Sequence, residues 1–214
     1  MGFGIEDKFI KKTFLNKLFY LFFYVSQNCY RRETYNQFYL KYNIDPSFRL
    51  NGEGITFYGD GVIKCGKNSY IGGYSSIQAY KNCKVVIGNN CSIGRFVKIF
   101  TCNAVADQDF SKELKYSKGD VIIGDNCWIG IGVFIKEGVK VGSNVVIGAN
   151  SAVVKDVPSD SVAAGAPAKI IKFKSYLSNL EKEKLADKYW DSLSDKLKIE
   201  FKRLRNNKNP GLWS

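Results

Sequence analysis

Apolar side chains recur at every sixth position through most of the chain. The pattern occurs in three blocks: Cys65, Ile71 and Ile77; Ile87, Ile93 and Ile99; and Ile123, Ile129, Ile135, Val141, Ile147 and Val153. A period of six fits neither the 3.6-residue period of a helix nor the two-residue alternation of a strand. It predicts a solenoid in which each unit forms one short flat side and a corner, and three units close a triangular coil.

The other positions of the six-residue unit follow the same period. A small or β-branched residue stands four places after the apolar one: Ser69, Ser75, Cys91, Val97, Cys127, Val133, Val139, Val145 and Ser151. Gly often follows the apolar residue directly, as at Gly124 and Gly130. We expect the apolar and small side chains to fill the interior, and Gly or Asn to form the tight corners.

Both ends of the repeat carry helical patterns. Residues 5–40 are aromatic and basic, and residues 175–206 have apolar side chains at roughly helical spacing. The sequence therefore predicts three parts: a helical N-terminal extension over 1–50, an all-β solenoid core over 51–172 and a C-terminal helical tail over 173–214. We expect the tail to pack on its own solenoid or on a neighbouring subunit.

The run FLNKLFYLFFYV, residues 14–25, is apolar but interrupted by Lys17. It is too short for a membrane span, which needs about 20 predominantly apolar residues, and no small-residue cleavage site follows it. One interpretation is a helix that is buried or packs between subunits. The other is a weak peripheral membrane anchor with Lys8, Lys11, Lys12 and Lys17 near lipid headgroups, which would place the protein at the inner face of a bacterial membrane.

The charge balance favours anionic partners. The chain has 32 Lys and Arg against 20 Asp and Glu, a formal net charge of +12, which attracts nucleic acid, acidic membranes, phosphorylated cofactors or polyanions. Its basic residues are dispersed and match no nucleic-acid-binding motif, so we expect no nucleic-acid partner.

The cysteines and the lack of histidine limit the metal chemistry. None of the six cysteines forms a CxxC pair and the chain contains no His, which excludes a Cys/His zinc site. It also excludes the solenoid carbonic anhydrases, which need three zinc-bound histidines. We predict no metal, and small buried thiols in a reducing cytoplasm.

The repeat stops at residues 101–120, which begin with the polar stretch TCNAVADQDF. An extruded loop of this length can reach a neighbouring subunit, and loops carried by a rigid scaffold often build functional sites. This interruption is therefore the first candidate for an active site.

The repeats together with IGDNCWIG (123–130) and VIGANSAVVKDVPSDSVAAGAPAKII (146–171) resemble the hexapeptide-repeat acetyltransferases, in particular the bacterial capsule O-acetyltransferases that act on sialic acid. The resemblance covers about residues 52–172. It implies a left-handed parallel β-helix, a homotrimer with active sites between subunits, and acetyl-CoA bound along the edge of the coils.

The resemblance also implies site residues. Trp128 corresponds to the Trp beside the acetyl group, and amides near Trp128 and Gly130 are candidate oxyanion donors. The implied cofactor-binding residues are Trp128, Gly130, Ala149, Lys155, Ala164, Lys169 and Lys172, with the lysines at the phosphates. The alternatives are a Trp that only caps a coil face and a solvated basic surface.

The family's general base is missing. Much of the family has a His 24 residues before that Trp, and here this position is Ala104 (128 − 104 = 24), preceded by Asn103. Three explanations stay open: a His→Ala substitution, a natural variant that uses another base or the substrate itself, and a scaffold without turnover. Asp107 and Asp109 are near, but an ordinary Asp pKa of about 3.9 makes a poor base for a hydroxyl; burial would have to raise it.

Two acceptor classes fit the resemblance. One is a hydroxyl of an acidic surface glycan such as a polysialic-acid capsule, contacted by Asn103, Lys112, Lys115 and Tyr116 in the loop. The other is a nucleotide-linked amino sugar, whose amine tolerates a missing base better. A transferase that uses acyl carrier proteins and a CoA-binding trimer without turnover are the remaining alternatives.

Overall fold

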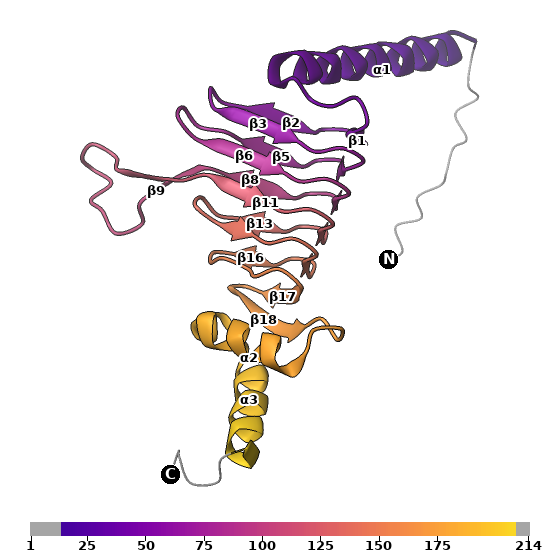
Figure 1. The fold of residues 1–214 in the computed structure, drawn as a ribbon. Helices are drawn as coiled ribbons and strands as arrows, with labels where there is room; N and C mark the ends of the chain where they lie inside the picture. Colours follow the sequence, from indigo (N-terminus) through magenta and orange to yellow (C-terminus); the bar gives the residue numbers. More distant parts are fainter. Residues whose placement is uncertain (1–13, 209–214) are drawn as a thin grey trace, which may run out of the picture. The chain divides into compact units, whose positions relative to one another are not determined.

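The computed structural model describes residues 14–208 (Figure 1). The chain forms two compact units, residues 1–37 and residues 38–214. The first unit contributes most of helix α1 (Phe14–Tyr42). The helical pattern expected over 5–40 thus begins, in the described part, at Phe14 and extends to Tyr42, whereas residues 5–13 lie outside the described residues.

The second unit is built around a left-handed β-solenoid of about 5 turns, as the repeat predicts (Figure 1). Three sheets form its faces. The first face contains β1 (Arg49–Asn51), β4 (Tyr70–Gly72), β7 (Ser92–Ile93), β12 (Trp128–Ile129), β15 (Val146–Ile147), β17 (Ser161–Gly165) and β18 (Ala168–Phe173). The second contains β2 (Thr56–Tyr58), β5 (Ser76–Gln78), β8 (Lys98–Phe100), β13 (Phe134–Ile135) and β16 (Ala152–Val153). The third contains β3 (Val62–Cys65), β6 (Lys84–Ile87), β11 (Val121–Ile123) and β14 (Lys140–Val141).

Consecutive strands visit the three faces in turn, and each strand pairs in parallel with the strand one coil away. Ile129 of β12, for example, lies opposite Ile93 of β7 and Ile147 of β15. Within the three sheets of the solenoid the exception is the last pair, β17 and β18, which is antiparallel. This register stacks the apolar position of each unit on the same position of the next coil.

The interior confirms the predicted pattern. All twelve apolar repeat positions and all nine small positions named above are buried. Asn and Gly have different roles at the corners. Asn residues such as Asn90 and Asn126 adopt the left-handed conformation, with φ of 55° and 57°. The repeat glycines serve close stacking instead: a Cβ on Gly130 would lie 2.6 Å from the backbone nitrogen of Ala149.

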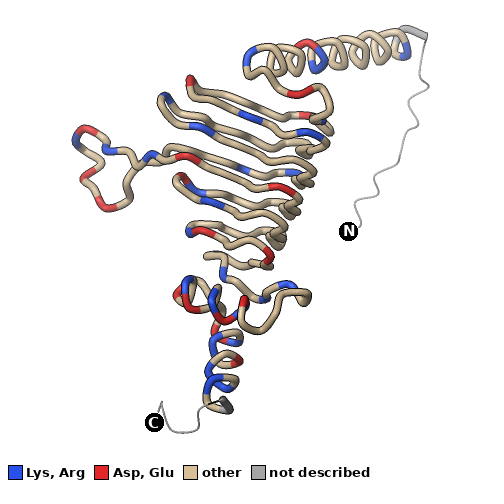
Figure 2. Tube along the Cα trace, in the orientation of Figure 1, with Lys and Arg blue, Asp and Glu red and all other residues tan. Residues whose placement is uncertain are grey.

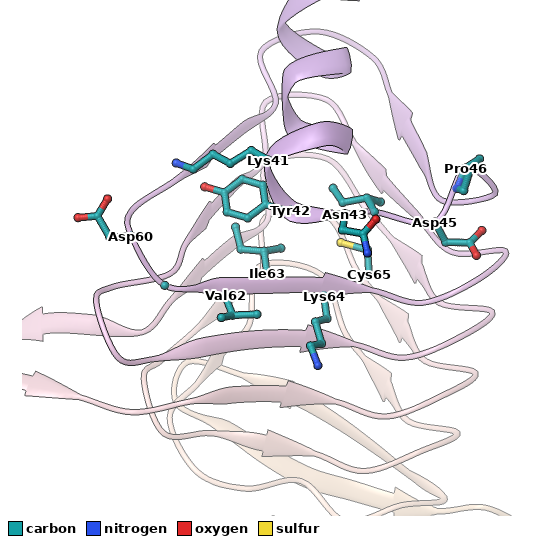
Figure 3. Close-up of a pocket in the computed structure, with 12 residues that line it drawn as sticks. Lys41, Tyr42, Asn43, Asp45, Pro46, Asp60, Val62, Ile63, Lys64 and Cys65 are labelled. Atoms are coloured by element: carbon teal, nitrogen blue, oxygen red, sulfur yellow. The ribbon is translucent and has the colours of Figure 1, made fainter.

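Aromatic and aliphatic side chains cap the N-terminal end of the solenoid. Tyr42, Ile44 and Phe48 are buried, and the rings of Phe38 and Tyr42 pack on Phe57 with centroids 5.2 and 6.2 Å away. Beside this cap lies an open cavity of about 940 Å³ between residues 41–46 and strand β3 (Figure 3). The third face ends at this strand.

The C-terminal tail packs on its own solenoid. It comprises α2 (Asn179–Lys188), a 3-10 helix (Trp190–Ser192) and α3 (Asp195–Lys208). A separate cluster joins strand β18 to these helices: Ile170, Phe173, Ala186, Leu193, Leu197 and Phe201. The helical pattern over 175–206 is interrupted because Leu193 bridges to Ile170 and the Ser194 N–H donates to the Ile170 carbonyl at 2.8 Å.

Four of the cysteines are buried as predicted: Cys65, Cys91, Cys102 and Cys127. Cys83 is half-buried, and the prediction is wrong for Cys29, which lies exposed on α1. No group of three or more Cys, Asp or Glu side chains that could hold a metal gathers within residues 14–208. Within the same range, no helix combines the length and apolar character required to cross a membrane.

The interior column makes a direct stability prediction. Ile129 is fully buried, whereas Ile131, two residues later, is 48% exposed. We expect Ile129→Ala to lower the free energy of unfolding by about 2–5 kcal/mol because it leaves a cavity, and Ile131→Ala to change it by less than about 0.5 kcal/mol. Urea unfolding at one fixed protein concentration measures both, and equal effects would contradict the inward orientation of Ile129.

Candidate functional site

The interruption of the repeat is an antiparallel hairpin. Its stem pairs β9 (Cys102–Ala104) with β10 (Tyr116–Lys118), and Ala104 lies opposite Tyr116. The hairpin leaves the solenoid between β8 and β11, at the corner between the second and third faces, and extends away from the coils (Figure 1). The Gly119 N–H donates to the Thr101 carbonyl at 3.0 Å and closes its root.

A buried carboxylate lies under this root. The Glu137 side chain is 2% exposed, and its Oε2 accepts a hydrogen bond from Asn103 Nδ2. Lys136 Nζ lies 3.2 Å from the other carboxylate oxygen, Oε1, as an ion pair. Stacking is also close here, since a Cβ on Gly119 would lie 2.7 Å from the Gly138 Cα. The corner at 136–138 therefore supports the hairpin stem directly.

Burial raises the pKa of Glu137, but the hydrogen bond from Asn103 and further donors outweigh it, so the pKa lies below its ordinary value. The carboxylate stays ionised and positions the stem. Sequence reasoning missed Glu137. The available signal was that Lys136 replaces the Gly that follows the apolar residue in the neighbouring units.

The predicted site residues fall into two groups. The first group occupies the first face and its corner with the second face: Trp128, Gly130, Ala149, Ala164, Lys169 and Lys172. The second group occupies the corner between the second and third faces and the hairpin: Asn103, Ala104, Lys112, Lys115, Tyr116 and Lys155. Within one chain the second face separates the two groups.

In the first group, an exposed Trp stands beside a strip of small residues. Trp128 is 62% exposed on β12. At the neighbouring corner Gly130 stacks on Ala149, and a Cβ on Gly148 would lie 2.9 Å from the Ala164 Cβ. An extended ligand can approach backbone closely where side chains are this small. Lys172 is exposed, whereas Lys169 Nζ donates to the Asp191 carbonyl at 2.9 Å.

The predicted oxyanion donors are already in use. The Trp128 N–H donates to the Val145 carbonyl and the Gly130 N–H donates to the Ile147 carbonyl, both at 2.8 Å. The prediction is wrong for these two amides, because the hydrogen bonds between coils take up the strand N–H groups.

The hairpin lacks a carboxylate suited to act as a base. Asp107 and Asp109 are both exposed. Hydrogen bonds from the Ser111 side chain and backbone lower the pKa of Asp109. Lys112 pairs with Asp109 at 3.3 Å. Ala104 is exposed and presents only a methyl group at the predicted base position.

The N-terminal cavity is a weaker candidate. Tyr42 lies above Ile63, and the thiol of Cys65 lies just below Asn43 (Figure 3). Burial raises the pKa of Cys65 to about 12, so its thiol is a poor nucleophile. None of the predicted site residues lines this cavity.

Comparison with known proteins agrees with the fold. Residues 120–155 match the family model of the bacterial transferase hexapeptide (six repeats). Over 110 residues the chain is 35% identical to the galactoside O-acetyltransferase of Escherichia coli (strain K12). This match covers 51% of this chain and 53% of that protein. The chain thus spans about half the length of the galactoside O-acetyltransferases that it matches.

Two solved structures are similar. A galactoside acetyltransferase in complex with coenzyme A is 29% identical with a TM-score of 0.53, and the match covers 70% of this chain and 86% of that one. A hexapeptide-repeat acetyltransferase of Vibrio cholerae O1 biovar eltor, complexed with acetyl coenzyme A, is 25% identical with a TM-score of 0.51, over 59% of this chain and 70% of that one.

The Glu137–Asn103 contact predicts how the hairpin stem is held. We expect Glu137→Gln to weaken a charge-assisted hydrogen bond, worth roughly 1.5–3 kcal/mol, and to speed amide exchange in 102–104 and 116–118 about tenfold or more. Glu113→Gln, on the exposed part of the hairpin, is the control. Unchanged exchange in the stem would contradict the positioning role.

This effect depends on pH with a defined sign. Because the folded-state pKa of Glu137 is depressed, its contribution is complete above the unfolded value of about 4.3 and is lost as the pH falls through the folded value. The difference between wild type and Glu137→Gln is therefore expected at neutral pH and should vanish in acid below the folded pKa.

Proposed function

We propose that this chain, whose repeats and relatives support the hexapeptide-repeat acetyltransferase family, transfers the acetyl group of acetyl-CoA to a hydroxyl of an acidic glycan. The observation that carries the proposal is the exposed Trp128 beside the small-residue strip at Gly130, Ala149 and Ala164. An extended thioester needs this combination: an open strip for its arm and an apolar surface beside the acetyl group.

The donor lies along the corner between the first and second faces. Its pantetheine arm follows Gly130, Ala149 and Ala164 towards β18, where Lys172 meets a phosphate. Lys169 contributes less, because its ammonium is held by the Asp191 carbonyl. The two similar structures, which are complexes with acetyl-CoA and CoA, support this choice of donor.

A complete site needs more than one copy of the chain. The hairpin and the donor strip lie at different corners of the same solenoid. The hairpin of a neighbouring copy, which projects away from its own coils, brings Asn103, Ala104 and Tyr116 of that copy to the strip, and Lys155 approaches from the solenoid corner of the same copy. A closed homotrimer satisfies this geometry with three equivalent sites.

In the reaction the acceptor oxygen attacks the thioester carbonyl carbon, the carbon–sulfur bond breaks, and the CoA thiolate leaves. The hydroxyl proton must move to a base before or during attack. Ala104 cannot accept it, and hydrogen bonds from Ser111 lower the pKa of Asp109, which makes that carboxylate a weaker base. Turnover by this chain then relies on substrate assistance or on a His restored at position 104; without either, the chain is a CoA-binding scaffold.

The acceptor is the least constrained part. The formal net charge of +12 favours a polyanionic glycan. The hairpin itself does not add to this, since Lys112, Lys115 and Lys118 are offset by Asp107, Asp109 and Glu113 (Figure 2). The missing base supports a second candidate, N-acetylation of a nucleotide-linked amino sugar, because a neutral amine attacks a thioester without prior loss of a proton.

Restoring the base is the direct test. We expect Ala104→His to raise the rate of thiol release from acetyl-CoA, with a sialic-acid oligomer as acceptor, by about 10²–10⁴-fold. Ala106→His, also exposed in the hairpin, is the matched control and should leave the rate unchanged.

The other outcomes separate the alternatives. Equal, substantial rates for wild type and Ala104→His would exclude position 104 as the base site and favour an amine acceptor. Binding of acetyl-CoA without turnover by either protein would favour the scaffold. Failure to bind acetyl-CoA would overturn the proposed function.

A further inference from the structure

Two bulky aromatic residues adopt a positive φ at corners of the solenoid, where the other described non-Gly residues with positive φ are Asn or Asp. Ten described non-Gly residues have positive φ. Seven are Asn and one is Asp, residues that tolerate this conformation. The other two are Tyr74 and Phe96, both at φ 58°. A bulky aromatic residue is strained there; such strain persists only where the surrounding structure imposes it, and it is found most often at functional sites.

The two strained residues form one exposed aromatic pair. They occupy the corner between the first and second faces on consecutive coils, with ring centroids 5.4 Å apart and planes 11° from parallel. Tyr74 is 45% and Phe96 47% exposed. The Arg95 guanidinium carbon lies 5.6 and 5.5 Å from the two centroids, and no carboxylate within residues 14–208 forms an ion pair with it.

The pair has one covered face and one open face. Gly54 lies against the Tyr74 ring, since a Cβ on Gly54 would come 2.6 Å from Tyr74 Cδ1. On the other side, the corner one coil beyond Phe96 is Gly132, which has no side chain and whose N–H donates to the Arg95 carbonyl at 2.9 Å. The next corner is Asn150, whose Oδ1 a Cβ on Gly132 would meet.

Gly132 places no side chain of its own over the Phe96 ring, and the Asn150 side chain reaches back to the position that a Cβ on Gly132 would take, so a ring on Phe96 would lie outward of Gly132. Adjacent coils are about 4.8 Å apart, so Phe96 and Asn150 are separated by roughly twice that distance. A ring stacked on Phe96 would lie at the level of Gly132, on the coil that carries Trp128. It would have an aromatic face on one side, the Asn150 amide on the other and the Arg95 guanidinium beside it.

We infer that Phe96, backed by Tyr74 and flanked by Arg95, is the platform on which a sugar ring of the acceptor stacks. The inference rests on the proposed function and names its acceptor subsite. The C–H face of a pyranose packs on an aromatic ring, the Asn150 amide exchanges hydrogen bonds with its hydroxyls, and Arg95 pairs with a carboxylate on the sugar. The platform continues the donor strip towards the N-terminal coils, so acceptor and thioester meet at Trp128.

The test measures acceptor and donor binding separately, by calorimetric titration of the full chain with a sialic-acid oligomer and with CoA. Phe96→Asn supplies the residue that the solenoid uses at this φ. We expect roughly five- to tenfold weaker binding of the oligomer, unchanged CoA binding and a melting temperature equal to or above that of wild type. Phe96→Tyr should bind as wild type does, and Tyr30→Asn, exposed on α1, is the control.

Arg95→Gln tests the charge. It should weaken binding of the sialic-acid oligomer and leave binding of a neutral glucose oligomer unchanged. Oligomer binding by Phe96→Asn equal to wild type would overturn the inference, as would wild type that binds CoA but not the oligomer. A loss of CoA affinity would assign the platform to the donor, and a loss of molecular mass in light scattering would assign it to a subunit contact. If the wild-type protein bound neither CoA nor the oligomer, the proposed function itself would be overturned.

A second observation, on α1, is independent of the active site. Residues 18–25, LFYLFFYV, are all between 49% and 75% exposed. At 100° per residue, eight consecutive positions point in every direction around the helix. A parallel or antiparallel copy of α1 would cover one side only, and a coiled-coil seam would leave polar residues on the outer side.

The geometry points to an anionic lipid surface as the partner of this segment. Lipid can surround an inserted helix on all sides, and Phe and Tyr favour the boundary between headgroups and acyl chains. Exposed Lys17 and Arg32 flank the segment and suit anionic headgroups. Lys8, Lys11 and Lys12 lie outside the described residues.

Vesicle co-sedimentation tests the lipid contact. We expect wild type to bind vesicles of phosphatidylcholine with phosphatidylglycerol and to bind pure phosphatidylcholine less. A triple variant, Phe19→Ser, Phe22→Ser and Phe23→Ser, should lower the partition coefficient on the order of 10²-fold or more. The control is Ile199→Ser with Leu204→Ser, two exposed apolar residues of α3. Retained vesicle binding by the triple variant, or its loss of molecular mass in light scattering, would overturn the proposal.

Discussion

The structure depends on the hydrogen bonds between successive coils. Each coil pairs in parallel register with the next, so the strand amides are committed, as at Trp128 and Gly130. The same register places one apolar and one small side chain of every unit inside. Because these hydrogen bonds occupy the strand amides and the interior is packed, only three parts of the solenoid can contribute to a site: the outward side chains, the corners, and the insertions between coils. Each feature of the candidate site belongs to one of these.

The interior could be predicted from the sequence because a solenoid is a one-dimensional object. Each unit meets the same unit one coil away, so a period alone determines which residues are buried. Ile129 and Val133, for example, follow from their position in the repeat. The hairpin could also be located, since an insertion must break the period.

The remaining features depend on contacts that no period encodes. Amides near Trp128 and Gly130 were predicted as oxyanion donors because the resemblance supplied a role but not the hydrogen-bond partners, which take up the amides of these two residues. The irregular unit at Lys136 was visible in the sequence, but the role of Glu137 was not, since it depends on a hydrogen bond from Asn103, 34 residues away. Tyr74 and Phe96 look like ordinary outward residues until their backbone conformation is known. The tail helix breaks at Leu193 because strand β18 offers it a pairing edge.

The residues that depart from the repeat gather at two places on the solenoid. The small-residue strip, Trp128 and the aromatic pair share one face and corner, whereas the hairpin and Glu137 share another. Within one solenoid the two corners cannot come together, because the packed second face lies between them. The proposed chemistry uses both groups, which is why the proposal includes a second copy of the chain, whose projecting hairpin would reach the strip.

The backbone position of residue 104 is set by the hairpin stem. The stem register, closed at Gly119 and supported by Glu137, holds residue 104 opposite Tyr116 whatever its side chain is. A methyl group there removes a proton acceptor but no structural contact, since Ala104 is exposed. The hairpin stem therefore keeps its register with Ala at position 104, the base position in the proposed function. Neither nearby carboxylate lies in a buried setting: Asp107 and Asp109 are exposed, and hydrogen bonds from Ser111 lower the pKa of Asp109.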